Sequence, residues 1–128
     1  MAVILIIDDD EAMRRLMVRT LGDAHTLIEA QNGQDGLALL KERHPDIVIT
    51  DILMPQKEGI ETIREIRQMA PATKIIAVSG GGASHNLMFL DIAKAFGADA
   101  ALAKPFRPAQ LAKTVELMLA KGPAEPDE

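Results

Sequence analysis

The stretch that decides the fold is Asp46-Ile47-Val48-Ile49-Thr50-Asp51, followed by Ile52-Leu53-Met54-Pro55. Its residues Ile47 to Ile49 form an unbroken β-branched run, which is typical of a central strand buried on both faces of a sheet. The run leads to the carboxylate of Asp51. Because open α/β folds bind ligands at the carboxyl edge of the sheet, Asp51 is a candidate functional residue. A helix cap or a turn aspartate would give the same local pattern.

Length and composition indicate one domain with an aliphatic core. The chain has 128 residues, and we expect a single domain over residues 1–121. Residues 122–128 are rich in proline and acidic residues and are expected to form a disordered tail. Hydrophobic residues make up 48% of the chain but aromatic residues only 2%. The absence of cysteine excludes disulfides, zinc–thiolate sites and cysteine nucleophiles.

Charge and the N-terminal residues bear on partners and location. Lysine and arginine number 14 against 19 acidic residues, which gives a net charge of -5. This balance argues against nucleic-acid binding through a basic face. The apolar run that begins at Met1 has no basic leader and is too short for a signal peptide or a membrane span. We therefore expect a cytoplasmic protein without nucleic-acid or membrane partners.

Strand and helix patterns alternate along the chain. Apolar runs predict strands, which lie at residues 3–7, 25–30, 46–51, 74–79 and 100–103. Apolar residues at helical spacing predict helices, at about residues 11–21, 36–43, 59–70, 84–96 and from Pro108 onward. Asn32-Gly33 indicates a turn. Several residues at helical spacing are expected in the core, among them Phe89, Phe96, Leu111, Val115, Met118 and Leu119.

This alternation predicts an α/β fold with a parallel sheet and helices on both faces. Right-handed crossovers leave few arrangements, one of which is the flavodoxin-like, doubly wound strand order 2-1-3-4-5. Its switch point lies between the first and third strands. Those strands lead into Asp8-Asp9 and end in Asp51, so three carboxylates are expected to meet in one crevice. Asp10 is expected to cap the first helix instead.

Clustered carboxylates repel one another, and a divalent cation can neutralise them. Oxygen ligands without histidine or cysteine suit Mg²⁺ or Mn²⁺. Ser79 at the end of the fourth strand and Lys104 at the end of the fifth add a hydroxyl and a positive charge at the same edge. A carboxylate nucleophile, a metal, a hydroxyl and a lysine are the groups required for phosphoryl transfer to an aspartate.

With these motifs the chain resembles the receiver domain of two-component response regulators. The resemblance spans about Ala2 to Ala120 and includes the acidic pair, Asp51-Ile-Leu-Met-Pro, Gly59, Ser79 and Lys104-Pro105-Phe106. It implies that Asp51 accepts a phosphoryl group from a histidine kinase or phosphotransferase. It also implies that Lys104 and Ser79 contact that group, and that the bond before Pro105 is often cis.

The resemblance further implies a set of metal ligands. Asp9 and Asp51 would bind Mg²⁺ directly, Asp8 would bind it through water, and the backbone carbonyl of Leu53 would complete the protein ligands. We expect a signalling phosphoacceptor with no chemistry beyond its own phosphorylation and dephosphorylation, so not an enzyme in the usual sense. Phosphorylation-dependent contacts with a downstream protein would carry the signal.

Three features depart from the family pattern. Ala101 occupies the position at which the family commonly has an aromatic side chain that swings inward on phosphorylation. How activation changes the surface of this protein is therefore left open. The loop Gly80-Gly81-Gly82 is rich in glycine and a few residues longer than usual, which favours mobility. We expect no DNA-binding output domain. Members of the family often pair through the fourth and fifth helices and the fifth strand, and a weak homodimer is left open.

Two other functions fit parts of the pattern. A phosphorylation-independent adaptor could use the same fold, and Ala101 keeps that alternative open. An aspartyl-phosphate phosphohydrolase would share the nucleophile, metal and lysine, but it needs a second acid at the position of Leu53. Arg14, Arg15 and Arg19 are interpreted as a solvated helix face, with docking of a kinase or phosphotransferase as the alternative hypothesis.

Overall fold

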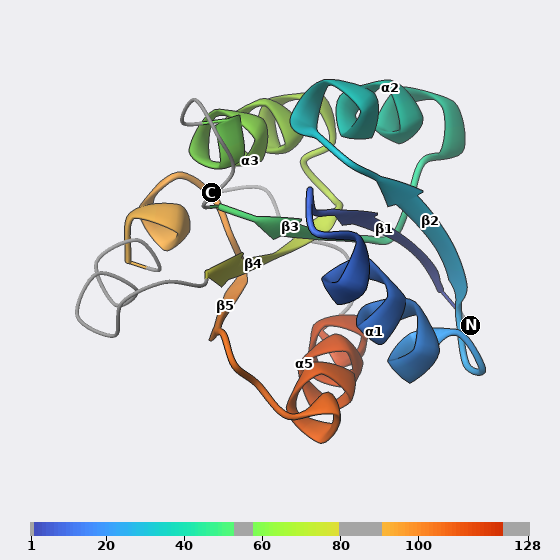
Figure 1. The fold of residues 1–128 in the computed structure, drawn as a ribbon. Helices are drawn as coiled ribbons and strands as arrows, with labels where there is room; N and C mark the ends of the chain where they lie inside the picture. Colours follow the sequence, from blue (N-terminus) through green and yellow to red (C-terminus); the bar gives the residue numbers. More distant parts are fainter. Residues whose placement is uncertain (1, 53–57, 80–90, 122–128) are drawn as a thin grey trace.

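The computed structural model describes residues 2–52, 58–79 and 91–121 of the chain. Its centre is a parallel five-stranded sheet with the order β2-β1-β3-β4-β5 (Figure 1). In chain order the strands are β1 (Val3–Ile7), β2 (Thr26–Ala30), β3 (Ile47–Asp51), β4 (Lys74–Ser79) and β5 (Ala100–Ala103). The predicted strand order is therefore confirmed, and β1 lies beside β3 at the switch point.

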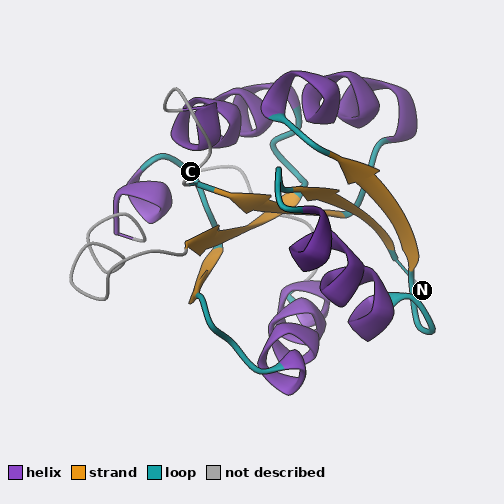
Figure 2. Ribbon diagram, in the orientation of Figure 1, coloured by secondary structure: helices purple, strands orange, loops and turns teal. Residues whose placement is uncertain are grey.

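Helices cover both faces of this sheet. The helices are α1 (Glu11–Leu21), α2 (Gly33–Arg43), α3 (Glu58–Met69) and α5 (Pro108–Ala120). Helices α2 and α3 lie on one face, and α1 and α5 lie on the other (Figures 1 and 2). Residues 91–95 are also helical and match the end of the predicted fourth helix. Among the described helices, none combines the length and apolar character that a membrane span needs.

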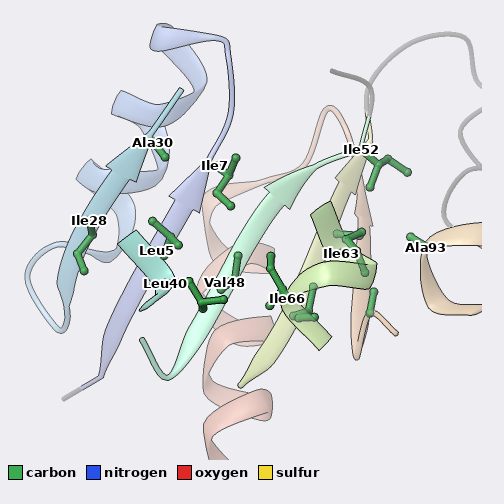
Figure 3. Close-up of a cluster of buried hydrophobic side chains, with 13 residues drawn as sticks. Leu5, Ile7, Ile28, Ala30, Leu40, Val48, Ile52, Ile63, Ile66 and Ala93 are labelled. Atoms are coloured by element: carbon green, nitrogen blue, oxygen red, sulfur yellow. The ribbon is translucent and has the colours of Figure 1, made fainter. Parts of the chain in front are cut away.

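One core cluster fills the space between the sheet and helices α2 and α3 (Figure 3). Leu5 and Ile7 of β1 face this side and meet Leu40 of α2 and Ile63 and Ile66 of α3. The side chains of Leu5, Ile7, Ile63 and Ile66 are fully buried. Burying a side chain of this size contributes about 1.5–3 kcal/mol, so the cluster holds the two layers together.

A second cluster lies on the opposite face, beneath α1 and α5. Ile4 and Ile6 alternate with Leu5 and Ile7 along β1 and are also fully buried. Burial on both faces explains why the central strands read as continuous apolar runs instead of alternating ones. Met17 of α1 packs into the same cluster.

Three sequence predictions about the elements are wrong in detail. Helix α2 begins at Gly33 and not at residue 36, because Asn32 caps it: the Asn32 Oδ1 atom accepts a 2.8 Å hydrogen bond from the backbone N–H of Asp35. Phe96 is 44% exposed and Leu119 is 37% exposed, so neither is a core residue. The predicted glycine loop, Phe89 and the predicted tail lie outside the described residues.

Candidate functional site

Two neighbouring strands bring acidic residues to the same edge of the sheet. Ile7 of β1 is in register with Thr50 of β3. The next residue of each strand path, Asp8 and Asp51, therefore lies at the same level along the sheet. The backbone N–H of Asp8 also donates a 3.1 Å hydrogen bond to the carbonyl of Ala30 in β2. Asp8 is thereby fixed to the sheet, although it follows the last residue of β1.

Three carboxylates converge at this edge. Asp8, Asp9 and Asp51 each present an oxygen atom, and these atoms lie within 4.8 Å of one another. Asp8 is 0% exposed and Asp51 is 6% exposed, whereas Asp9 is open to solvent. The predicted convergence of the three carboxylates is therefore confirmed.

Burial makes ionisation of the Asp8 carboxyl group unfavourable. Desolvation raises the pKa of Asp8 above its ordinary value, and the nearby charge of Asp51 acts in the same direction. The hydrogen bond from the backbone N–H of Asp10 at 2.8 Å and the charge of Lys104 oppose this rise without cancelling it. The protein alone therefore compensates the acidic cluster only in part.

Lys104 follows β5, the edge strand two positions from β3 in the sheet, and its side chain reaches the carboxylate cluster. Its backbone N–H donates to the carbonyl of Ser79 at 2.6 Å, which extends the pairing of β5 with β4 by one step. Its Nζ atom lies 3.0 Å from Oδ2 of Asp51 and 3.2 Å from Oδ2 of Asp8. Burial alone would lower the pKa of Lys104. The hydrogen bonds and charges of Asp51 and Asp8 outweigh burial, so the pKa of Lys104 lies above its ordinary value. The lysine is held as a cation.

Local structure separates Asp10 from the cluster. Its Oδ1 atom accepts hydrogen bonds from the backbone N–H groups of Ala12 and Met13 at 2.9 and 3.3 Å, so Asp10 is the N-cap of α1. The predicted cap is confirmed. Of the three consecutive aspartates, two face the site and the third starts the helix.

Gly59 lets helix α3 begin close to the end of β3. A Cβ atom at Gly59 would lie 2.3 Å from the Cα atom of Ile52 and 2.7 Å from the carbonyl oxygen of Asp51. No side chain fits between these backbones. The glycine eight positions after Asp51 is thus needed because of a close approach beside the candidate nucleophile.

Comparisons with known proteins decide the family. The sequence profile of the response regulator receiver domain matches residues 4–116. The chain belongs to the response regulator receiver family. The resemblance seen in the sequence is therefore confirmed.

Individual relatives of this receiver domain agree with the family match. The chain is 36% identical over 114 residues to the chemotaxis protein CheY of Thermotoga maritima, covering 88% of this chain and 92% of that protein. It is also 36% identical over 107 residues to the KDP operon transcriptional regulatory protein KdpE of Escherichia coli, covering 83% of this chain but 46% of that protein. A CheY-like receiver domain protein from Methanospirillum hungatei superposes with a TM-score of 0.83 at 28% identity and covers 93% of this chain and 94% of its own.

The remaining predicted residues of the receiver site occupy different situations. Ser79 is the last residue of β4 and is 0% exposed. Ala101 lies in β5 in register with Ala77, three residues before Lys104. The Lys104-Pro105 bond is cis. Leu53, predicted to offer its carbonyl to a metal, lies outside the described residues.

Sequence reasoning missed Arg14. Helical spacing places its side chain on a solvated face, but the side chain is only 15% exposed. Its Nη1 atom donates a 2.6 Å hydrogen bond to the backbone carbonyl of Asp8. The position of Arg14 one turn after the helix cap Asp10 was the available signal, because that position lies over the end of β1.

The acidic residues fit a hard divalent cation. Every available ligand atom in the cluster is a carboxylate oxygen, which suits Mg²⁺ or Mn²⁺. Lys104 pairs with Asp8 and Asp51, but burial, together with the charge of Asp51, still keeps the pKa of Asp8 above its ordinary value. The exposure of Asp9 leaves room for the several water ligands that Mg²⁺ usually keeps.

Proposed function

We propose that this receiver domain accepts a phosphoryl group on Asp51 from the phosphohistidine of a histidine kinase or phosphotransferase. The observation that supports this most is the position of Lys104 Nζ, within 3.2 Å of both Asp8 and Asp51. A carboxylate flanked by a fixed cation and two further carboxylates can serve as nucleophile, charge partner and metal site together.

Phosphoryl transfer to Asp51 exchanges the P–N bond of the donor for a P–O bond. A carboxylate oxygen of Asp51 attacks phosphorus and forms a P–O bond, while the P–N bond of phosphohistidine breaks. The electron pair of that bond stays on the imidazole nitrogen, which then takes up a proton from solvent. Lys104, already within hydrogen-bond distance of Asp51, donates to an oxygen of the incoming group. Hydrolysis later returns the Asp51 carboxylate and inorganic phosphate.

The same proposal assigns roles to the other residues. Asp9 and Asp51 would hold Mg²⁺ directly and Asp8 through water, with the carbonyl of Leu53 as a further predicted ligand. When bound, Mg²⁺ neutralises charge on the phosphoryl oxygens during transfer. The Ser79 hydroxyl, at the end of β4 beside Lys104, hydrogen-bonds one of those oxygens. The domain acts on itself alone, as a phosphoacceptor.

The phosphorylated domain signals by changed contacts with a downstream protein. A phosphorylation-independent adaptor is the second candidate, and the small residue Ala101 supports it. Ala101 of β5 pairs with Ala77 of β4. At the position of Ala101 the family usually carries an aromatic side chain whose orientation changes on phosphorylation. A phosphorylation-dependent receiver would need other residues near Ala101 to change conformation on phosphorylation. A phosphorylation-independent adaptor would need no such change.

The test uses a small phosphodonor, acetyl phosphate, with and without Mg²⁺. Intact-mass spectrometry of the wild-type protein should show one added phosphoryl group that depends on Mg²⁺. Asp51→Asn should show none, and Asp23→Asn, which changes an exposed aspartate outside the cluster, should match the wild type. No adduct on the wild-type protein would favour the adaptor.

A further inference from the structure

Arg14 and its neighbour Arg15 have different surroundings in α1. The Nη1 atom of Arg14 lies 2.6 Å from the carbonyl oxygen of Asp8, and its Nε atom lies 3.3 Å from Oε1 of Glu29 at the edge of β2. Only 15% of the Arg14 side chain is exposed. Arg15 is 69% exposed and pairs within the helix with Glu11. Arg14 therefore joins α1 to Glu29 of β2 and to the backbone of Asp8 after β1, whereas Arg15 contacts only its own helix.

The carbonyl that Arg14 holds belongs to the peptide between Asp8 and Asp9. The N–H side of Asp8 is fixed by β2, through the bond to Ala30. Its carboxylate is fixed by the backbone N–H of Asp10 and by Lys104. The carbonyl contact with Arg14 fixes the orientation of the following peptide plane. That plane sets the direction in which the Asp9 side chain leaves the backbone.

Asp9 depends on this orientation more than its neighbours do. Within the described part of the chain, no hydrogen bond or ion pair reaches its carboxylate, and the residue is exposed. Asp8 and Asp51 are buried and bound to Lys104. The orientation of the backbone at Asp9 therefore limits where this carboxylate can reach within the cluster.

We propose that Arg14 is a positioning residue for the cation site, which holds the Asp8–Asp9 peptide so that the Asp9 carboxylate faces Asp8 and Asp51. The proposal rests on the proposed function, since it concerns the Mg²⁺ that this function requires. Glu29 supports the guanidinium from the opposite side and offsets its charge. The favourable contribution that we assign to Arg14 is the orientation of this peptide.

The positioning role and the charge of Arg14 predict opposite changes in Mg²⁺ affinity when Arg14 is removed. Arg14 is a cation close to a site for cations, so by charge alone its removal would strengthen Mg²⁺ binding. Loss of a positioning contact would instead weaken it, because outer residues that orient metal ligands typically change metal affinity about 10- to 100-fold. The two effects act in opposite directions on one measured dissociation constant.

The experiment compares the full-length wild-type protein with Arg14→Met, Arg14→Lys and Arg15→Met. Titration with MgCl₂ is followed by backbone amide NMR, since the chain has no tryptophan or tyrosine for fluorescence. Arg14→Met should bind Mg²⁺ roughly 10-fold more weakly. Arg14→Lys should fall in between, because an ammonium can reach the carbonyl but lacks the fork that also holds Glu29. Arg15→Met should match the wild type or bind slightly more tightly.

A second readout follows the peptide without metal. In Mg²⁺-free spectra, Arg14→Met should shift the amide signals of Asp9 and Asp10, and Arg15→Met should leave them in place. A folded Arg14→Met variant that binds Mg²⁺ as tightly as the wild type, or more tightly, would overturn the role of Arg14. A wild-type protein that binds no Mg²⁺ would overturn the metal part of the proposed function, and the role of Arg14 with it.

Discussion

The Nζ atom of Lys104 lies 3.0 Å from Oδ2 of Asp51, across 53 positions of the chain. The same atom lies 3.2 Å from Oδ2 of Asp8, so one cation joins the ends of β1, β3 and β5. The side chains involved are largely shielded from water, with Lys104 16% exposed and Asp51 7% exposed. Changes at any of the three residues should therefore affect the other two.

Replacing Lys104 by methionine should destabilise the metal-free protein. Asp8 and Asp51 would be left without their cation, and breaking such a buried pair is costly. Because Lys104 is partly exposed, we expect a loss of about 2–3 kcal/mol in the free energy of unfolding, measured with urea in EDTA. Saturating Mg²⁺ should restore much of it. Lys113→Met, on the exposed face of α5, is the control, and an equal loss in both variants would refute the prediction.

The raised pKa of Asp8 predicts an unusual pH dependence. The folded protein holds the Asp8 proton more tightly than the unfolded chain does, so this residue destabilises the metal-free fold above its raised pKa. That cost disappears as the pH falls through the raised pKa toward the ordinary value of 3.8. Asp8→Asn should therefore raise the urea midpoint at pH 7 in EDTA, and its advantage over the wild type should shrink in acid. A variant less stable than the wild type at pH 7 would contradict this.

A methyl group at Gly59 should disturb both the fold and the site. Its Cβ atom would meet the backbone of Ile52 and of Asp51, which cannot move away as a side chain can. We expect Gly59→Ala to cost about 2 kcal/mol or more and to slow phosphorylation. Gly36→Ala is the comparison in α2, because the atom nearest to its new Cβ would be Cδ1 of the buried Ile7, at 2.4 Å, and a side chain can shift where a backbone cannot, so its cost should be smaller. Thermal unfolding of both variants checks the contrast, and equal effects would argue against the backbone clash.

Arg67 should stabilise the fold without taking part in phosphorylation. Its guanidinium donates to the carbonyls of Pro71, Thr73 and Gly97 and to the Asp99 carboxylate, at 2.6 to 3.2 Å. These contacts join the end of α3 to the turns that precede β4 and β5. Arg67→Met should lower the free energy of unfolding by about 1–3 kcal/mol, because several partly buried acceptors lose their donor.

The control for this prediction is Arg64→Met, one turn earlier on the exposed side of α3, which should be within about 0.5 kcal/mol of the wild type. The rate of phosphorylation below the unfolding transition should be unchanged in both variants. A slower Arg67→Met reaction in folded protein would show that the α3 contacts influence the site.

The strands and their order could be predicted because burial leaves a direct mark on the sequence. Ile47 to Ile49 are fully buried on both faces, so no polar residue interrupts the run. The meeting of Asp8, Asp9 and Asp51 then follows from topology, since parallel strands end at the same edge. Their roles in phosphoryl transfer stay a prediction.

Contacts that depend on side-chain direction could not be predicted. Asn32-Gly33 has the composition of a turn, yet Asn32 uses its side chain to cap α2. Arg14 was assigned to solvent because helical spacing separates polar from apolar residues, and it contains no information about a guanidinium that reaches a backbone carbonyl. Phe96 fits an apolar stripe by spacing but lies in the turn that follows the helical residues 91–95, where it is exposed.

The measurement that tests the central claim most directly locates the phosphoryl group. The wild-type protein is incubated with acetyl phosphate and Mg²⁺, reduced with borohydride, and sequenced by tandem mass spectrometry. An acyl phosphate on aspartate is reduced to homoserine, so homoserine should replace aspartate at position 51 and at no other position. Homoserine at Asp8 or Asp9, or its absence from a protein that has taken up phosphate, would contradict Asp51 as the acceptor.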